Sequence, residues 1–378
     1  MDVFSFSIYI IVFSISSLFL YFSEKTRTKK GVSACCVIIS MLLPCLLAAF
    51  RNHSVGVDVD LYVTPNFQFA KSVLKKGFFF FYENMPLQTE IGFAGIIYIG
   101  ALFDSLPFSF LIMQLLVIVP IFAGLKKQSR GISLLIGMLC YFFLFYNVSL
   151  SAMRGSIAMA LLFYSFYYLG TDKYIKFWAF VCIGLLFHSS IVLVAVISFL
   201  IYLALKKQNK RIVLWGIVLF FISFYFLSTR YVYVLMEIAA LFNPRYAYYL
   251  LEYMGEGSSA NIPTTDLLTK TLIIVIVLFL MKKKHTFLSE NRIVRCLIVY
   301  VAIGRFFVLY NGVFYEALRV AYYFDMFLIL LVAQLPRLYL KTNNKFTIGL
   351  IVLLPAFLYW LRFIMIIGGY GTNVYKFA

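Results

Sequence analysis

The sequence predicts an all-α polytopic membrane protein with a single transmembrane domain over residues 1–378, and its composition supports this in three ways. Of the 378 residues, 63% are hydrophobic and only 13% are charged, whereas soluble domains average about 45–50% apolar and about 25% charged residues. The mean hydropathy is +0.94. Apolar runs long enough for membrane helices recur along the whole chain.

Basic residues between the apolar runs predict the topology. The first span is expected at residues 1–22, which lack the basic start and small-residue cleavage site of a signal peptide. Six short breaks carry 21 of the 33 lysines and arginines, and the positive-inside rule places them in the cytoplasm: 23–30, 126–130, 171–176, 206–211, 282–295 and 336–345. Topology thus explains most of the net charge of +18 without a nucleic-acid partner. About 12 crossings follow, with both termini outside.

Two segments have unusual lengths for this topology. Residues 91–103 would rise only about 20 Å as a helix, and a full crossing there would move the next basic break outside. We therefore expect a re-entrant segment within an outer loop at 51–105. Residues 177–205 lie between two cytoplasmic breaks, which predicts a hairpin with its tip at 187–190, surrounded by protein or by a water-filled cavity. A second outer loop is expected at 229–266.

Six arginines in or beside the outer halves of the spans are not explained by topology, whereas the cytoplasmic breaks contain mainly lysine. A guanidinium stays charged when desolvated and binds phosphate through paired hydrogen bonds. Snorkelling or a structural ion pair is the alternative at each position, and Arg305 could pair with Asp325. Arg154 and Arg319, each followed by aromatic membrane sequence, are expected to share an anionic ligand. The six are Arg51, Arg154, Arg230, Arg245, Arg305 and Arg319.

The outer segments also contain acids and histidines suited to proton transfer. His53, Asp58 and Asp60 follow the second span, Glu90 opens the re-entrant segment, and His188 lies at the hairpin tip. Histidine titrates near neutral pH, although a single histidine in a membrane helix is often a structural hydrogen-bonding group. Two alternating aspartates are weak support for a metal site. We expect neither a metal nor a cofactor.

Three motifs occur in order along the chain. The first is RNHSVGVDVDLY at 51–62, with Arg51, Gly56, Asp58 and Tyr62; the second is EIGF at 90–93; the third is SAMRGSIA at 151–158, followed by FHSS at 187–190. Together they resemble the signature of the EpsG/Wzy-type polysaccharide (O-antigen) polymerases, which are GT-C-like membrane glycosyltransferases. RYAYYL at 245–250 and EALRVAYYF at 316–324 are weaker matches. Gly155 departs from the family pattern, which often has glutamine there.

The resemblance implies a metal-independent polymerase for O-antigen, capsule or exopolysaccharide at the periplasmic face of the bacterial plasma (inner) membrane. It would join oligosaccharide repeat units carried on undecaprenyl diphosphate, which serve as donor and acceptor, within membrane lipid and with a chain-length regulator as a further partner. A base and a set of diphosphate-binding cations are then needed. We expect catalysis by His188, Asp58 and Glu90, diphosphate binding by Arg51, Arg154, Arg245 and Arg319, and glycan contacts by His53, Asp60, Tyr62, Tyr249 and Tyr323.

Two other classes of membrane protein fit the composition. A transporter, such as a flippase for the same lipid-linked oligosaccharide, also carries arginines in a wet cavity, but it often shows internal repeats or broken helices in corresponding halves. No repeat is evident here. An acyltransferase acting on surface glycans should have a catalytic histidine and acid on the cytoplasmic side, and the sequence has none there.

Overall fold

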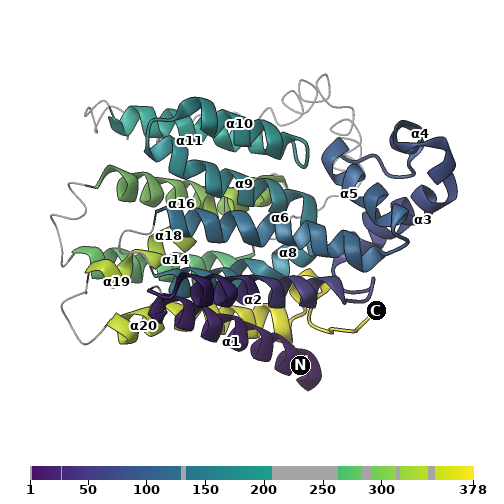
Figure 1. Cartoon of the computed structure of the whole chain (residues 1–378). Helices are drawn as coiled ribbons and strands as arrows, with labels where there is room; N and C mark the ends of the chain where they lie inside the picture. Colours follow the sequence, from purple (N-terminus) through teal and green to yellow (C-terminus); the bar gives the residue numbers. More distant parts are fainter. Residues whose placement is uncertain are drawn as a thin grey trace.

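The computed structural model describes residues 2–26, 28–128, 133–206, 263–282, 291–311, 316–338 and 345–378. Every regular element within these ranges is helical, so the predicted all-α class is confirmed (Figure 1). Arg230, Arg245 and Tyr249 lie outside the described residues, as does nearly all of the expected outer loop at 229–266.

Five helices of the described residues are long and apolar enough to cross a membrane. They are α1 (Val3–Lys25), α2 (Lys30–Ala49), α6 (Leu106–Lys127), the continuous stretch formed by α7 (Leu134–Tyr141), η3 (Phe142–Tyr146) and α8 (Asn147–Ser151), and α14 (Thr264–Lys282). Shorter apolar helices include α5 (Ile91–Leu102), α10 (Tyr174–Leu185) and α11 (Ile191–Lys206). The count of about 12 crossings and the re-entrant role of α5 stay predictions.

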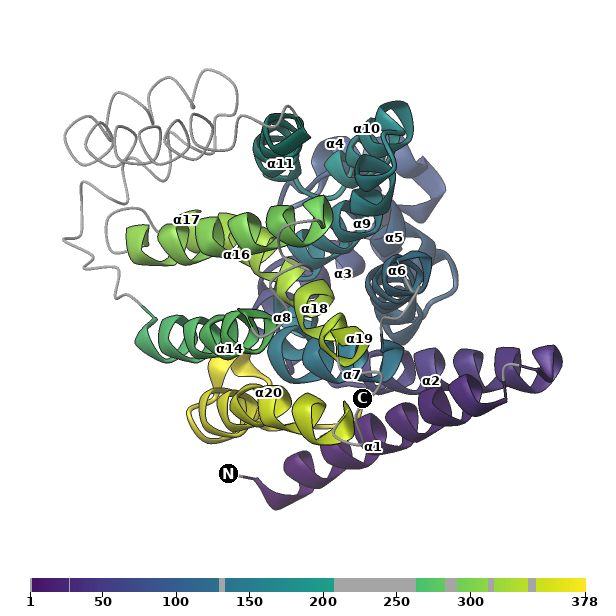
Figure 2. The ribbon, with the colours of Figure 1, turned by 90° about the vertical axis from the view of Figure 1, so that its left-hand side faces the viewer.

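The remaining helices complete the bundle and its two ends. They are η1 (Val59–Val63), α3 (Thr64–Val73), η2 (Leu74–Lys76), α4 (Phe78–Asn84), α9 (Met153–Gly170), α16 (Arg292–Tyr310), α17 (Glu316–Asp325), α18 (Phe327–Ala333), α19 (Leu335–Leu338), α20 (Lys345–Tyr359), η4 (Trp360–Ile366) and η5 (Gly369–Gly371). Helix α9 packs against α6, α10 and α11. Figure 2 shows α1 and α2 along one side of the bundle and α10 and α11 along the opposite side.

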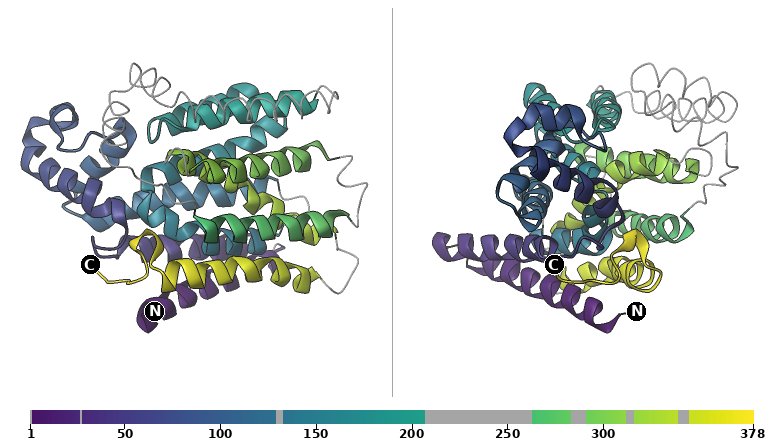
Figure 3. Two further views of the ribbon diagram at one scale, coloured as in Figure 1. Left: turned by 180° about the vertical axis from the view of Figure 1, so that it is seen from behind. Right: turned by 90° about the vertical axis from the view of Figure 1, so that its right-hand side faces the viewer.

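The N- and C-terminal segments meet at one end of the bundle. Helices α3, α4 and α5 lie at one end together with both termini, as Figures 1 and 3 show. The termini contact each other there: the backbone N–H of Tyr375 donates to Ser5 Oγ at 2.6 Å, and the Tyr9 hydroxyl donates to the Thr372 carbonyl at 3.0 Å. Both termini on one side agree with the predicted topology.

The predicted hairpin is present. Helix α10 ends at Leu185 and α11 begins at Ile191, and the two helices contact each other and α9. His188 therefore lies in the tight turn between them, as the basic breaks on both sides of this run require.

A buried cluster of four charges joins α14, α16 and α17. Lys270 Nζ lies 2.6 Å from Asp266 Oδ1 and 3.0 Å from Asp325 Oδ2. Arg305 lies 3.2 Å from Asp266 Oδ2 and also hydrogen-bonds to Asp325, which confirms their expected pairing. Two cations thus offset two carboxylates in a region where an unpaired charge would be costly.

Candidate active site

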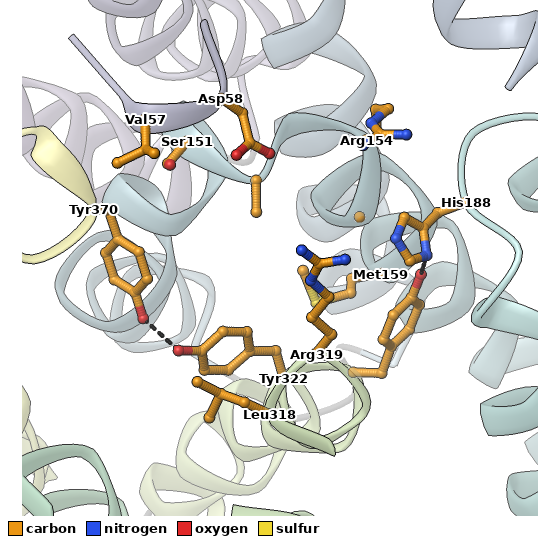
Figure 4. A pocket seen from close by; sticks show the side chains of 13 residues that line it. Val57, Asp58, Ser151, Arg154, Met159, His188, Leu318, Arg319, Tyr322 and Tyr370 are labelled. Atoms are coloured by element: carbon orange, nitrogen blue, oxygen red, sulfur yellow. Dashed lines mark hydrogen bonds between the residues drawn. The ribbon is translucent and has the colours of Figure 1, made fainter. Parts of the chain in front are cut away.

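A cavity of about 300 Å³ lies where five distant segments meet. It is formed by the loop after α2, the junction of α8 and α9, the hairpin tip, α17 and the C-terminal segment (Figure 4). Its volume is at the lower end of the range for small-molecule sites. The lining residues are Val57, Asp58, Ser151, Ala152, Arg154, Gly155, Met159, His188, Leu318, Arg319, Tyr322, Tyr323 and Tyr370.

Arg154, in the first turn of α9, is held by a carboxylate from another part of the chain. Its Nη1 donates to Glu90 Oε2 at 2.9 Å, with side-chain exposures of 13% and 20% respectively. Its guanidinium carbon also lies 4.5 Å from the centre of the Tyr62 ring. The sequence placed no acid within a turn of Arg154, and the fold supplies one.

Close packing at Gly92 brings Glu90 to this position. The N–H of Gly92 donates to the Leu186 carbonyl at 2.9 Å, so the start of α5 lies against the hairpin tip. A Cβ atom at Gly92 would come within 2.8 Å of that carbonyl oxygen. The spacing of Glu90 and Gly92 therefore has a physical reason. Gly92 allows the start of α5 to lie against the hairpin tip, and this places Glu90 where it pairs with Arg154.

Asp58 enters the cavity from a tightly packed loop. Gly56 has φ +102°, and a Cβ atom there would lie 2.5 Å from the Leu150 carbonyl oxygen, so the loop depends on glycine at this position. Burial raises the pKa of the Asp58 carboxyl, and the positive charges of Arg154 and Arg319 oppose that shift. Asp58 lies outside the spanning helices, at the start of η1.

His188 forms a pair with Tyr323 of α17. The N–H of Ser190 donates to His188 Nδ1 at 3.4 Å, and the Tyr323 hydroxyl lies 3.3 Å from the same nitrogen (Figure 4). Because a backbone N–H can only donate, Nδ1 is an acceptor, and the neutral ring carries its proton on Nε2. His188 thus lines the cavity as a ring whose donor N–H is at Nε2.

Arg319 and two tyrosines complete the wall opposite Asp58. The Arg319 side chain points into the cavity from α17 (Figure 4). One turn along, the hydroxyls of Tyr322 and Tyr370 share a hydrogen bond of 2.7 Å. The Tyr322 ring lies 4.9 Å from Lys270 Nζ, so the buried charge cluster borders this wall.

Other predicted site residues lie outside the cavity lining. Arg51 is 2% exposed, its guanidinium carbon lies 4.4 Å from the centre of the Phe110 ring, and its Nη2 lies 3.0 Å from Met153 Sδ. It thus holds the loop against the start of α9. His53 Nδ1 and Asp60 Oδ1 form an exposed pair at 2.7 Å.

Sequence reasoning did not single out Tyr322 and Tyr370. Tyr322 is next to Tyr323, which was expected to contact glycan. Tyr370 has φ +64° within the segment GGYG at 368–371, where Gly368 and Gly371 also have positive φ. This glycine-rich turn is the feature of the sequence that could have indicated an unusual backbone conformation at Tyr370.

Within the described ranges, no group of three His, Cys, Asp or Glu side chains is arranged to hold a metal ion. The cavity instead combines two guanidinium groups, a carboxylate of raised pKa and an imidazole donor. Such a set can bind a phosphate ester and accept a proton beside it.

The chain is similar to a known protein family over most of its length. The EpsG family model matches residues 34–377. No curated protein and no solved structure matches the chain.

Proposed function

The chain belongs to the EpsG family of polysaccharide polymerase-type membrane proteins, and from this premise we propose that it joins oligosaccharide repeat units carried on undecaprenyl diphosphate. The reaction takes place at the outer face of the bacterial plasma membrane. The growing glycan is transferred from its lipid carrier onto the non-reducing end of the next lipid-linked unit.

The observation that carries this proposal is the meeting of Arg154 and Arg319 at one cavity with Asp58. The two arginines come from different helices, α9 and α17, and each borders the same space (Figure 4). Guanidinium groups suit a diphosphate because each can form two parallel hydrogen bonds to its oxygens. Their charge stabilises the negative charge that develops on the leaving group.

Asp58 is the best candidate for the base among the three expected catalytic residues. The Glu90 carboxylate already accepts a hydrogen bond from Arg154 and serves to position that arginine. His188 accepts at Nδ1 and so presents a proton when neutral. Burial favours the protonated form of Asp58, which makes its carboxylate a stronger base than an exposed one.

The acceptor hydroxyl oxygen attacks the anomeric carbon of the donor sugar, and its proton passes to Asp58. The bond between that carbon and the diphosphate oxygen breaks, and undecaprenyl diphosphate leaves with the bonding electrons. Arg154 and Arg319 hold the diphosphate, and His188 donates a hydrogen bond to it from Nε2. Tyr323 positions His188.

The test replaces cavity residues and follows the surface polysaccharide of the parent bacterium on a gel. We expect Arg319→Ala and Asp58→Asn to collapse the ladder to a single repeat unit on its acceptor, with normal levels of each protein in the membrane. Arg319→Lys should restore little activity, because an ammonium cannot form the paired hydrogen bonds. The matched control is Arg362→Ala in η4, an exposed arginine that does not line the cavity.

Two other results would contradict the proposal. If even the single repeat unit disappears from the surface, export has failed before polymerisation, and a flippase for the lipid-linked oligosaccharide replaces the polymerase. A ladder unchanged in both variants would refute the proposed roles of Arg319 and Asp58.

A further inference from the structure

A second cavity lies where α1 ends and α2 begins, separate from the candidate active site. It has a volume of about 460 Å³ and lies among α1, α2, α6 and α7. Its lining combines polar side chains at the helix ends with apolar side chains farther along the helices: Ser23, Glu24, Lys30, Ser33, Ala34, Val37, Ile38, Phe122, Lys126 and Leu134.

The polar part of this cavity is positively charged. Lys30 begins α2 and Lys126 lies in the last turn of α6, and both side chains are exposed. No carboxylate of the described residues forms an ion pair with either lysine. Glu24, the acid of the lining, accepts the N–H of Leu134 at 3.2 Å and so caps the start of α7. Two lysines and one glutamate thus line the same opening, and its net positive charge would suit an anion.

The apolar part continues onto a face of α2 that is exposed among the described residues. Ile38 is 51% exposed, and Leu42 and Leu46, one and two turns farther along, are 37% and 38% exposed. Because α2 is apolar and long enough to span a membrane, lipid covers this face in the bilayer. A ligand seated between the lysines can thus extend directly along the hydrocarbon side of α2.

We propose that this cavity binds the headgroup of an anionic phospholipid, with its phosphate between Lys30 and Lys126 and an acyl chain along α2. Basic pockets between helix ends recognise such headgroups through charge. A soluble phosphate would use the lysines but not Val37, Ile38 and Phe122, which favours the lipid. This inference does not depend on the proposed polymerase activity.

The test is thermal unfolding of the purified full-length protein in detergent micelles. Phosphatidylglycerol, phosphatidylcholine or inorganic phosphate is added over a range of concentrations. We expect a saturable rise in Tm with phosphatidylglycerol and a much smaller rise with the other two. The double variant Lys30→Ala with Lys126→Ala should lose most of the rise. The matched control, Lys173→Ala with Lys176→Ala, removes two exposed lysines of another basic break and should keep it.

Each other result would overturn the proposal. Equal rises with phosphatidylglycerol and phosphatidylcholine would mean that acyl chains alone are bound. A rise with inorganic phosphate as large as that with phosphatidylglycerol would indicate a site for soluble phosphate. Loss of the rise in the control variant as well would indicate general surface charge. A second variant, Lys30→Glu with Lys126→Glu, should abolish the phosphatidylglycerol effect by repulsion, and retention of the effect there would also refute the site.

Discussion

Removing one charge from the buried cluster of two cations and two carboxylates should destabilise the protein, because the remaining charges no longer balance. Arg305 contacts both Asp266 and Asp325, and Lys270 is the second cation of the group. Arg305→Met would leave two carboxylates to share one ammonium. Removing one partner of a buried pair typically costs about 3–5 kcal/mol. At about 2 °C per kcal/mol for a long chain, the Tm should fall by roughly 6–10 °C.

The same reasoning predicts that a second substitution restores stability. Asp325→Asn alone leaves one carboxylate for two cations and should also be costly. Combined with Arg305→Met, it leaves Asp266 and Lys270 as a neutral pair 2.6 Å apart. We expect the double variant to be more stable than Arg305→Met by more than half of the initial loss, which is a strong coupling in a double-mutant cycle.

The assay is thermal unfolding of the purified variants in one detergent, with Arg362→Met as the control for loss of an exposed arginine. Polymerisation measured below the Tm shows whether α17, which carries Arg319, stays in place. If Arg305→Met unfolds within about 1 °C of the parent, the burial argument is wrong. If the two single losses simply add in the double variant, charge balance is not what stabilises the cluster.

Two further predictions concern the candidate active site. Gly92→Ala should abolish polymerisation, because its Cβ would lie 2.8 Å from the Leu186 carbonyl oxygen and displace the hairpin tip; Gly95→Ala, on the same helix with open space around it, should be active. The polymerisation rate should rise with pH as Asp58 ionises, at a higher pH than for an ordinary aspartate, because burial raises its pKa. Arg319→Gln removes a charge that opposes the shift but also a proposed diphosphate contact, so the titration of Asp58 is followed without turnover, by infrared difference spectroscopy with Asp58→Asn to identify its carboxyl band. The pKa of Asp58 should rise in Arg319→Gln and stay in place in Arg362→Gln. A parent enzyme whose acidic limb lies where an ordinary aspartate titrates would contradict the role of Asp58 as base.

The sequence by itself determined the class of the protein and several local features. Hydropathy and the basic breaks depend on short stretches, so they predicted the helical fold, the hairpin tip at 187–190 and both termini at one end. The cost of a buried charge singled out Arg154 and Arg305, and the same cost pointed to Asp325 as the partner of Arg305.

Only the tertiary structure decided how these residues combine. Glu90 and Arg154 are 64 positions apart and His188 and Tyr323 are 135 apart, and nothing in their local sequence encodes either contact. Arg51 appeared equivalent to Arg154, yet it is packed against Phe110 and Met153 and does not line the cavity. Hydropathy is set by each segment alone, whereas a cavity is set by which helices pack together. Close approaches such as Gly92 to Leu186 decide that packing, and they are visible only once the chain has folded.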